Sequence, residues 1–237
     1  MKALILNSGV GRRMGKHTTE YPKCMTEISK YETILSRQLN MLAECGIQDI
    51  VITTGPFEEK LKKYCLSLNL PLNYFFVHNP IYESTNYIYS LYLAGNFLKD
   101  GEVLLMHGDL VFDYNVLVAI LAEERSCVAV SRTVKIPEKD FKAVLFSNGY
   151  VQKIGVEFFT DAVAAWGLYK LSKKDFCIWF DKIKQFCDAG KTGVYAEDAL
   201  NEVTDRCKIF SLNIGDMLCS EIDVLDDLEL IREKVKE

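Results

Sequence analysis

Short apolar segments alternate with segments of helical periodicity through the first part of the chain. Residues 2–7 form an apolar run, and residues 50–53 form a β-branched run. Between them, residues 34–43 carry apolar side chains at helical spacing and end before Gly46, which suits a helix C-cap. A strand–helix–strand unit of this kind predicts parallel strands, because the crossover helix returns the chain to the end of the sheet at which the first strand began.

The alternation continues beyond this first unit. The sequence predicts helices near 57–68 and 86–98, and strands near 73–77 and 103–106, the last of which ends at Gly108-Asp109. Alternation of strands and helices is typical of a sheet that is covered on both faces. We therefore expect an α/β fold with a mostly parallel, Rossmann-like mixed sheet and helices on both faces.

Beyond residue 130 the pattern is mixed. Asn148-Gly149 suits a tight hairpin turn between apolar segments at 144–146 and 150–151. The other elements that we expect are strands near 163–170 and 208–213, and helices near 173–188, 196–204 and 225–236. We find no repeat, linker or low-complexity segment, and 237 residues suit one domain. We therefore expect a single domain over residues 1–237.

Charge and cysteine usage exclude several classes of protein. The formal net charge of −5 disfavours binding along nucleic acid, which needs a broad basic surface. The eight cysteines are scattered singly without a CxxC pair, so structural zinc is not expected. No segment has the length and apolar character of a signal peptide or a membrane span. We expect a cytoplasmic protein without membrane insertion.

The loop after the first strand combines glycines with basic residues. Within residues 6–25 these are Gly9, Gly11, Gly15, Arg12, Arg13, Lys16 and Lys23. Glycine lets the backbone approach an anion and the cations neutralise it, so the loop is predicted to bind phosphate. A dinucleotide fingerprint is disfavoured because Met14 stands where its third glycine belongs, and a Walker motif is disfavoured because Gly-Lys-Ser/Thr is missing. The alternative is a flexible, solvated loop.

The motifs along the chain together resemble a known superfamily. They are Gly9-x-Gly11-x-Arg13-Met14, Pro22-Lys23, Thr54-Gly55, Asn86-Tyr87-Ile88-Tyr89-Ser90, Gly108-Asp109 and Glu221-Ile222-Asp223. In these motifs, and over nearly the whole chain, the sequence resembles the sugar-phosphate nucleotidyltransferases. The resemblance is closest to bacterial phosphocholine cytidylyltransferases and their relatives acting on aminoethylphosphonate or phosphoglutamine. It implies a GT-A-like fold with a nucleotide-binding half, 1–130, and an acceptor-binding half, 131–237.

The resemblance also implies an activity, namely transfer of CMP from CTP to a small phosphate or phosphonate with release of pyrophosphate. It assigns catalytic roles to Lys23, Arg13 and Asp109, and Mg²⁺ ligation to Asp109 and Asp223. Nucleotide binding is assigned to Leu6, Asn7, Ser8, Gly9, Gly11, Arg12, Arg13, Lys23, Gly55, Asn86, Ser90 and Asp109. The position of Asp109 just after a strand agrees with this, because ligands of α/β sheets collect there. As alternatives, Asp223 and Asn86 only cap helices.

Candidate acceptor residues lie in the second half of the chain. They are Lys142, Lys153, Trp166, Tyr195, Glu197 and Asp198. Ala196 stands where phosphocholine enzymes tend to have a second aromatic residue, which favours a primary ammonium or an amino-acid-like acceptor over choline. A sugar-1-phosphate nucleotidyltransferase that uses another nucleotide and a non-catalytic nucleotide-binding protein are the alternatives. The three histidines, His17, His78 and His107, show no metal or triad spacing.

Overall fold

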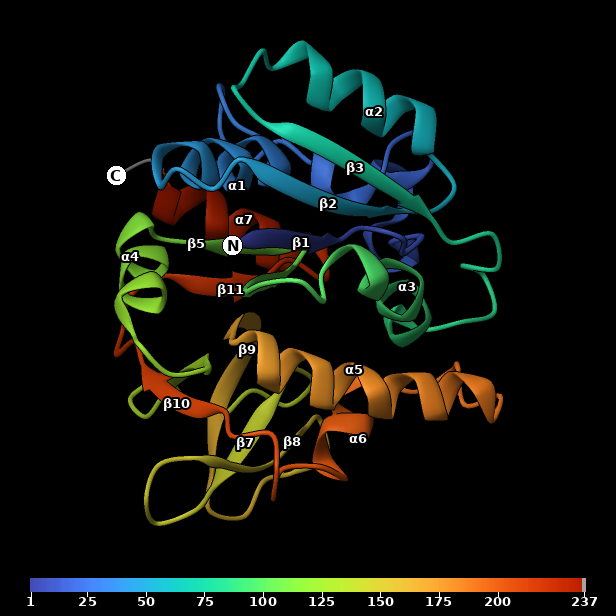
Figure 1. Ribbon diagram of the computed structural model, residues 1–237. Coiled ribbons are helices and arrows are strands. Elements are labelled where there is room, and N and C mark those ends of the chain that lie inside the picture. The colour runs from blue at the N-terminus through green and yellow to red at the C-terminus, as the bar shows by residue number, and fades with distance from the viewer. Residues whose placement is uncertain (236–237) are drawn as a thin grey trace.

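The computed structural model describes residues 1–235, apart from the side chains of Lys16 and His17. Position 236, the predicted end of the last helix, lies outside this range. Four parallel strands form one part of the sheet: β1 (Lys2–Leu6), β2 (Asp49–Thr54), β3 (Asn73–His78) and β4 (Val103–His107). They stand in the order β4-β1-β2-β3, and Figure 1 shows the last three of these strands side by side. The parallel strand–helix–strand units expected from the sequence are therefore present.

The same sheet continues into the second half of the chain. Its remaining strands are β6 (Cys127–Ser131), β7 (Lys142–Leu145), β8 (Val151–Gly155), β9 (Ala162–Leu171) and β10 (Phe210–Asn213). The strand β9 runs antiparallel between β4 and β6 and also carries the β7–β8 hairpin. The result is a mixed, nine-stranded sheet to which both halves contribute.

Alternating side chains of the central strand β1 point into two different cores. Ala3 and Ile5 pack on one face of the sheet with α1 (Ile34–Glu44), α2 (Glu58–Ser67) and α4 (Tyr114–Ala122). Leu4 and Leu6 pack on the other with α3 (Tyr87–Ala94), α5 (Lys173–Asp188) and α6 (Ala196–Asn201). Because strand side chains alternate, a continuous apolar strand requires cover on both faces. The expected α/β fold is confirmed.

A small second sheet lies beside the carboxyl end of β4. It pairs β5 (Leu110–Phe112) with β11 (Cys219–Glu221) in antiparallel register, and α7 (Leu225–Val235) follows. A third apolar cluster packs α7 against this sheet and against the loop after β1, which contains the 3₁₀ turns η1 (Arg12–Thr18) and η2 (Lys23–Met25). Segments more than 100 residues apart in the chain are thereby brought together.

Some elements differ from those expected from the sequence. The helix predicted near 86–98 ends at Ala94 and continues as the 3₁₀ turn η3 (Gly95–Phe97). The helix predicted near 196–204 ends at Asn201. The sequence analysis did not predict the strands β5, β6 and β11, because strands of at most five residues give weak periodicity. It also missed the helix α4, which is rich in β-branched residues. No helix of the described residues is long and apolar enough to cross a membrane.

Candidate active site

A cavity of about 620 Å³ opens where β1, β3 and β4 end, at their carboxyl ends. This is the edge at which open α/β sheets bind ligands. Predicted nucleotide, catalytic and metal residues line it, namely Leu6, Asn7, Ser8, Gly9, Gly11, Arg12, Arg13, Lys23, Asn86, Asp109 and Asp223. Residues to which the sequence assigned no role also line it, among them Asn79, Thr85, Tyr87, His107, Asp140, Phe141 and Glu221.

Two aspartates and two cations meet in this cavity. Lys23 Nζ lies 2.7 Å from Asp109 Oδ2 and 2.8 Å from Asp223 Oδ1, and Arg13 Nη1 lies 2.7 Å from Asp223 Oδ2. The β5–β11 pairing brings the aspartates together, since the N–H of Ile222 donates to Asp109 O at 3.1 Å. Residues from three distant parts of the sequence therefore form one cluster of charges, which we call the ion cluster (Arg13, Lys23, Asp109, Asp223).

Lys23 and Asp109 hold each other in the ionised state. Burial alone would raise the pKa of Asp109, but the nearby charges of Lys23 and His107 outweigh it and hold that pKa below its ordinary value. Burial would likewise lower the pKa of Lys23, but Asp109 and Asp223 outweigh it and raise that pKa. Asp109 is therefore an anion and Lys23 a cation at neutral pH.

The aspartates fit the requirements of Mg²⁺. One oxygen of Asp109 and one of Asp223 lie within hydrogen-bond distance of the same ammonium group, so the two carboxylates converge on a single point. Mg²⁺ takes oxygen ligands from one or two carboxylates and completes its shell with phosphates and water. Glu221 lies within reach of either aspartate, in groups with His107 and Asp109 and with Asp140 and Asp223.

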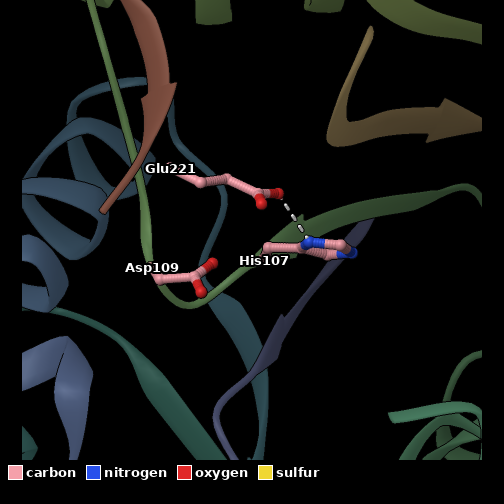
Figure 2. A group of neighbouring side chains, drawn as sticks. All are labelled: His107, Asp109 and Glu221. Atoms are coloured by element: carbon pink, nitrogen blue, oxygen red, sulfur yellow. Dashed lines mark hydrogen bonds and ion pairs between the residues drawn. The ribbon is translucent and has the colours of Figure 1, made fainter. Parts of the chain in front are cut away.

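His107 and Glu221 form a buried pair next to Asp109, as Figure 2 shows. His107 Nδ1 lies 2.9 Å from Glu221 Oε1. Burial opposes the charge on the imidazole, but the hydrogen bond and charge of Glu221 outweigh it and raise the pKa of His107 to about 9. The sequence analysis left His107 unassigned, and its place two residues before Asp109 at the end of a strand is the signal that could have indicated a wall of the cavity.

Ser8 and the segments behind it form the wall next to α3. A side chain at Gly55 would place its Cβ 2.3 Å from Ser8 O. The end of β2 can therefore approach the loop after β1 this closely only because position 55 is glycine. Ser90 hydrogen-bonds to Ser8 through their hydroxyls. Gly55 and Ser90 thus lie behind Ser8 and not among the residues lining the cavity.

Asn86 lines the cavity and also caps a helix. Its Oδ1 accepts a hydrogen bond of 2.7 Å from the N–H of Tyr87, the first residue of α3. The capping alternative considered for Asn86 is therefore realised in the fold. Asp223 instead directs its carboxylate at Arg13 and Lys23. In the first turn of α7, Asp227 Oδ2 accepts from the N–H groups of Asp223 and Val224, just before the helix, at 2.8 and 2.9 Å.

The predicted acceptor residues are largely dispersed by the fold. Tyr195 lines the cavity, where its ring lies 5.9 Å from that of Tyr87 and 5.2 Å from that of Phe141. Glu197 is buried behind this wall and accepts hydrogen bonds from the hydroxyls of Tyr87 and Tyr169. It therefore orients a ring of the wall without lining the cavity itself.

Four other predicted acceptor residues lie away from the cavity, which corrects the expectation for their positions. Lys142 is fully buried and donates to the carbonyls of Pro137 and Glu138. Trp166 packs in the core under α1 and α4. Lys153 is exposed on β8 with its Nζ 5.8 Å from the ring of Phe158, and Asp198 accepts from the N–H of Tyr195 at the start of α6. Local packing of the hairpin and of α6 decides these positions.

Comparison with known proteins agrees with this fold. Residues 3–162 match the model of a family described as the MobA-like NTP transferase domain. The chain belongs to this family. Two relatives named as cytidylyltransferases also match this chain over 99% of its length. Together with the family match, this shows that the protein is a nucleotidyltransferase.

Three relatives of this nucleotidyltransferase carry functional names. A CTP:phosphoglutamine cytidylyltransferase of Campylobacter jejuni is 24% identical over 99% of this chain and 100% of its own length. A choline-phosphate cytidylyltransferase of Haemophilus influenzae is 26% identical over 99% of this chain and 97% of its own length. A CMP-5'-(3-aminopropyl)phosphonate synthase of Streptomyces rubellomurinus is 33% identical over 57% of this chain, which spans only 21% of that longer protein.

Solved structures of other nucleotidyltransferases share the fold. The CTP:phosphocholine cytidylyltransferase of Streptococcus pneumoniae superposes with a TM-score of 0.78 at 20% identity, covering 99% of this chain and 98% of that one. The inositol-1-phosphate CTP transferase of T. maritima gives a TM-score of 0.80 at 20% identity, covering 100% and 96%. At this level of identity the comparison establishes the fold alone.

Proposed function

We propose that this nucleotidyltransferase transfers CMP from CTP to a small phosphate or phosphonate and releases pyrophosphate, with Mg²⁺ as cofactor. The observation that carries the proposal is the ion cluster, in which Lys23 and Arg13 meet Asp109 and Asp223 at the carboxyl ends of parallel strands. The names of the relatives support the choice of cytidine and of a phosphorylated acceptor.

The chemistry suits the residues that line the cavity. An oxygen of the acceptor attacks the α-phosphorus of the nucleotide, and the bond to the pyrophosphate oxygen breaks. Both groups are anionic, so the protein has to neutralise charge and align the reactants. Lys23 and Arg13 supply positive charge for the phosphates, Arg13 as a planar fork and Lys23 as a compact ammonium.

Asp109 and Asp223 would hold Mg²⁺, which supplies additional charge neutralisation at the phosphate oxygens. The backbone of Gly9 and Gly11 lines the same side of the cavity, where it allows close approach of phosphate groups. No side chain is required as a covalent nucleophile, since the acceptor itself provides the attacking oxygen. Catalysis then depends on position and charge.

The proposed function divides the chain into two contributions within one domain. Residues 1–130 provide the glycine loop, Lys23 and Asp109 for the nucleotide. Residues 131–237 provide the far side of the cavity through Asp140, Phe141 and Tyr195. Aromatic rings beside a carboxylate suit a cationic or polar group at the far end of the acceptor. This agrees with a small acceptor, for which the cavity of about 620 Å³ leaves room beside a nucleotide.

A substrate screen tests the proposal. CTP, UTP, ATP and GTP are each combined with phosphocholine, 2-aminoethylphosphonate, phosphoglutamine and glucose 1-phosphate, and pyrophosphate release is measured with Mg²⁺ present and absent. We expect turnover with CTP, dependence on Mg²⁺ and use of an acyclic acceptor. Turnover only with glucose 1-phosphate would instead support a sugar-1-phosphate nucleotidyltransferase, and nucleotide binding without turnover on any acceptor would contradict catalysis.

A further inference from the structure

Asn79 directly follows β3, and both the amino group and the oxygen of its side-chain amide are hydrogen-bonded. It is 1% exposed. Its Oδ1 accepts from the N–H of Ile81 at 3.0 Å, and its Nδ2 donates to Thr85 Oγ1 and to Ser90 Oγ, both at 3.0 Å. A buried amide with both groups paired has a single stable orientation.

Two neighbours determine which end of the amide faces Ser90. The backbone N–H of Ile81 can only donate, so the oxygen of Asn79 must face it. Thr85 gives its one hydroxyl proton to Ile81 O at 3.0 Å, so towards Asn79 it can only accept. Both constraints require the amino group of Asn79 to point at Ser90. Ser90 Oγ is therefore an acceptor in this contact.

Ser90 then has one proton left to place. Among the described residues, its other hydrogen-bond partner is Ser8 Oγ. Ser90 is 1% exposed, so a proton without an acceptor there would be unfavourable, whereas Ser8 lines the cavity. The consistent direction is donation from Ser90 to Ser8. The hydroxyl proton of Ser8 is then free to point into the cavity.

We propose that Asn79 is a positioning residue for base selection, which acts through Ser90 to make Ser8 a hydrogen-bond donor towards the nucleobase. Cytosine accepts a hydrogen bond at ring nitrogen 3, whereas uracil carries a proton there and donates. A donor at Ser8 that faces ring nitrogen 3 thus suits cytosine and opposes the N–H of uracil. A site that pairs its buried polar groups with one base discriminates against the base that leaves them unpaired. The inference rests on the proposed use of CTP.

Replacing Asn79 by aspartate should reverse the chain of hydrogen bonds. The carboxylate of Asn79→Asp has no N–H and accepts from Ser90, so Ser90 accepts from Ser8, and Ser8 presents a lone pair to the cavity. Calorimetric titration of the full-length protein with CTP and with UTP, in the presence of Mg²⁺, measures the result. We expect the ratio of CTP to UTP affinity to fall roughly tenfold or more, with UTP binding improved relative to wild type.

Asn201→Asp is the matched control. Asn201 also pairs both ends of its amide, with Ile154 N and Ile154 O at 2.8 Å, but it does not line the cavity. The same chemical change at this position should leave the CTP to UTP ratio unchanged. Ser8→Ala is the second variant, needed if Asn79→Asp fails to fold. It removes the proposed donor and should bring the ratio close to one.

The outcomes separate the inference from the proposed function. A wild-type protein that prefers CTP, with an unchanged ratio in folded Asn79→Asp or in Ser8→Ala, overturns the inference alone. A wild-type protein that binds UTP as tightly as CTP overturns the inference together with the cytidine part of the proposed function. A lowered ratio in Asn79→Asp and Ser8→Ala, but not in Asn201→Asp, supports it.

Discussion

Lys23 occupies the point at which the carboxylates of Asp109 and Asp223 converge. Its Nζ lies within 2.8 Å of an oxygen of each. A divalent cation that both aspartates hold has to displace this ammonium group, and the phosphates of a nucleotide offer Lys23 a new partner. Metal and nucleotide should therefore strengthen each other's binding, by a coupling that is the same in both directions.

The first prediction concerns Lys23→Ala. Without the competing ammonium, Mn²⁺ alone should bind more tightly than to wild type, whereas nucleotide affinity and turnover should each fall by roughly tenfold or more. Electron paramagnetic resonance of bound Mn²⁺ and calorimetry with nucleotide measure the two effects. Lys139→Ala removes another charge from the cavity wall and serves as the control. Unchanged Mn²⁺ affinity in folded Lys23→Ala would contradict displacement.

The second prediction concerns the aspartates. Asp109→Asn and Asp223→Asn should each abolish turnover and weaken Mn²⁺ binding in the nucleotide complex, because an amide keeps the shape but loses the charge that a hard cation needs. Pyrophosphate release and Mn²⁺ titration measure this.

The structure allows a separate control for the helix after Asp223. Because Asp227 accepts from the N–H groups of Asp223 and Val224 just before α7, Asp227→Ala should lower the free energy of unfolding by about 1 kcal/mol. Asp223→Asn should not have this effect. Near-normal turnover of Asp223→Asn would leave Asp109 as the single metal-binding carboxylate.

At the scale of elements, local patterns predicted the nucleotide side of the site and missed most of the acceptor side. The glycine loop is contiguous in sequence, and the position of Asp109 after an apolar strand is a local signal. The acceptor wall instead depends on how the β7–β8 hairpin packs on β9. Lys142 begins β7 and is buried there, and Trp166 lies on a strand whose two faces are both covered. Residue type alone does not reveal that placement.

Helix boundaries show the same dependence on packing. The apolar pattern of residues 86–98 continues past the true end of α3 at Ala94, because Phe97 and Leu98 extend it. At Gly95 the chain passes directly against α5, where an added Cβ would lie 1.9 Å from Cε2 of the Phe180 ring. The contact between two helices distant in sequence, rather than a local stop signal, marks this end.

The third prediction tests that contact. Gly95→Ala should lower the free energy of unfolding by about 1–3 kcal/mol, because the methyl group has to push the Phe180 ring out of a packed core. Gly101→Ala is the matched control, since a Cβ there meets nothing within 4 Å. It should change stability by no more than about 0.5 kcal/mol. Urea denaturation followed by circular dichroism compares the two, and equal stabilities would contradict the packing argument.

At the scale of the molecule, one sheet joins the two halves that the sequence analysis distinguished by function. The strand β9 of the second half pairs with β4 of the first and with β6, which spans the boundary between the halves, so neither half completes the sheet without the other. The two tryptophans of the chain report on opposite faces: Trp166 lies in the core with α1 and α4, and Trp179 in the core with α3 and α6.

The fourth prediction is that both cores unfold together. Variants that keep a single tryptophan, Trp166→Phe and Trp179→Phe, should each show one urea transition whose fluorescence midpoint coincides with that of its own circular dichroism, because the shared sheet couples the two faces. The two midpoints are compared within one variant, so a change in stability caused by the substitution itself shifts both equally. A fluorescence midpoint that departs from the circular dichroism midpoint in one variant would indicate halves that unfold separately.

The place of β9 also matters while the chain is being made. A ribosome delivers β4 by residue 107 but β9 only from residue 162, so the edge of β4 that pairs with β9 has no partner during synthesis of the 54 residues 108–161. At roughly 5–20 residues per second this is a delay of about 3–11 s, during which an apolar strand edge is open to wrong pairing. We therefore expect wrong pairing to be most frequent in the middle of synthesis, after the nucleotide loop and Asp109 have been made and before the strand that completes the sheet around them.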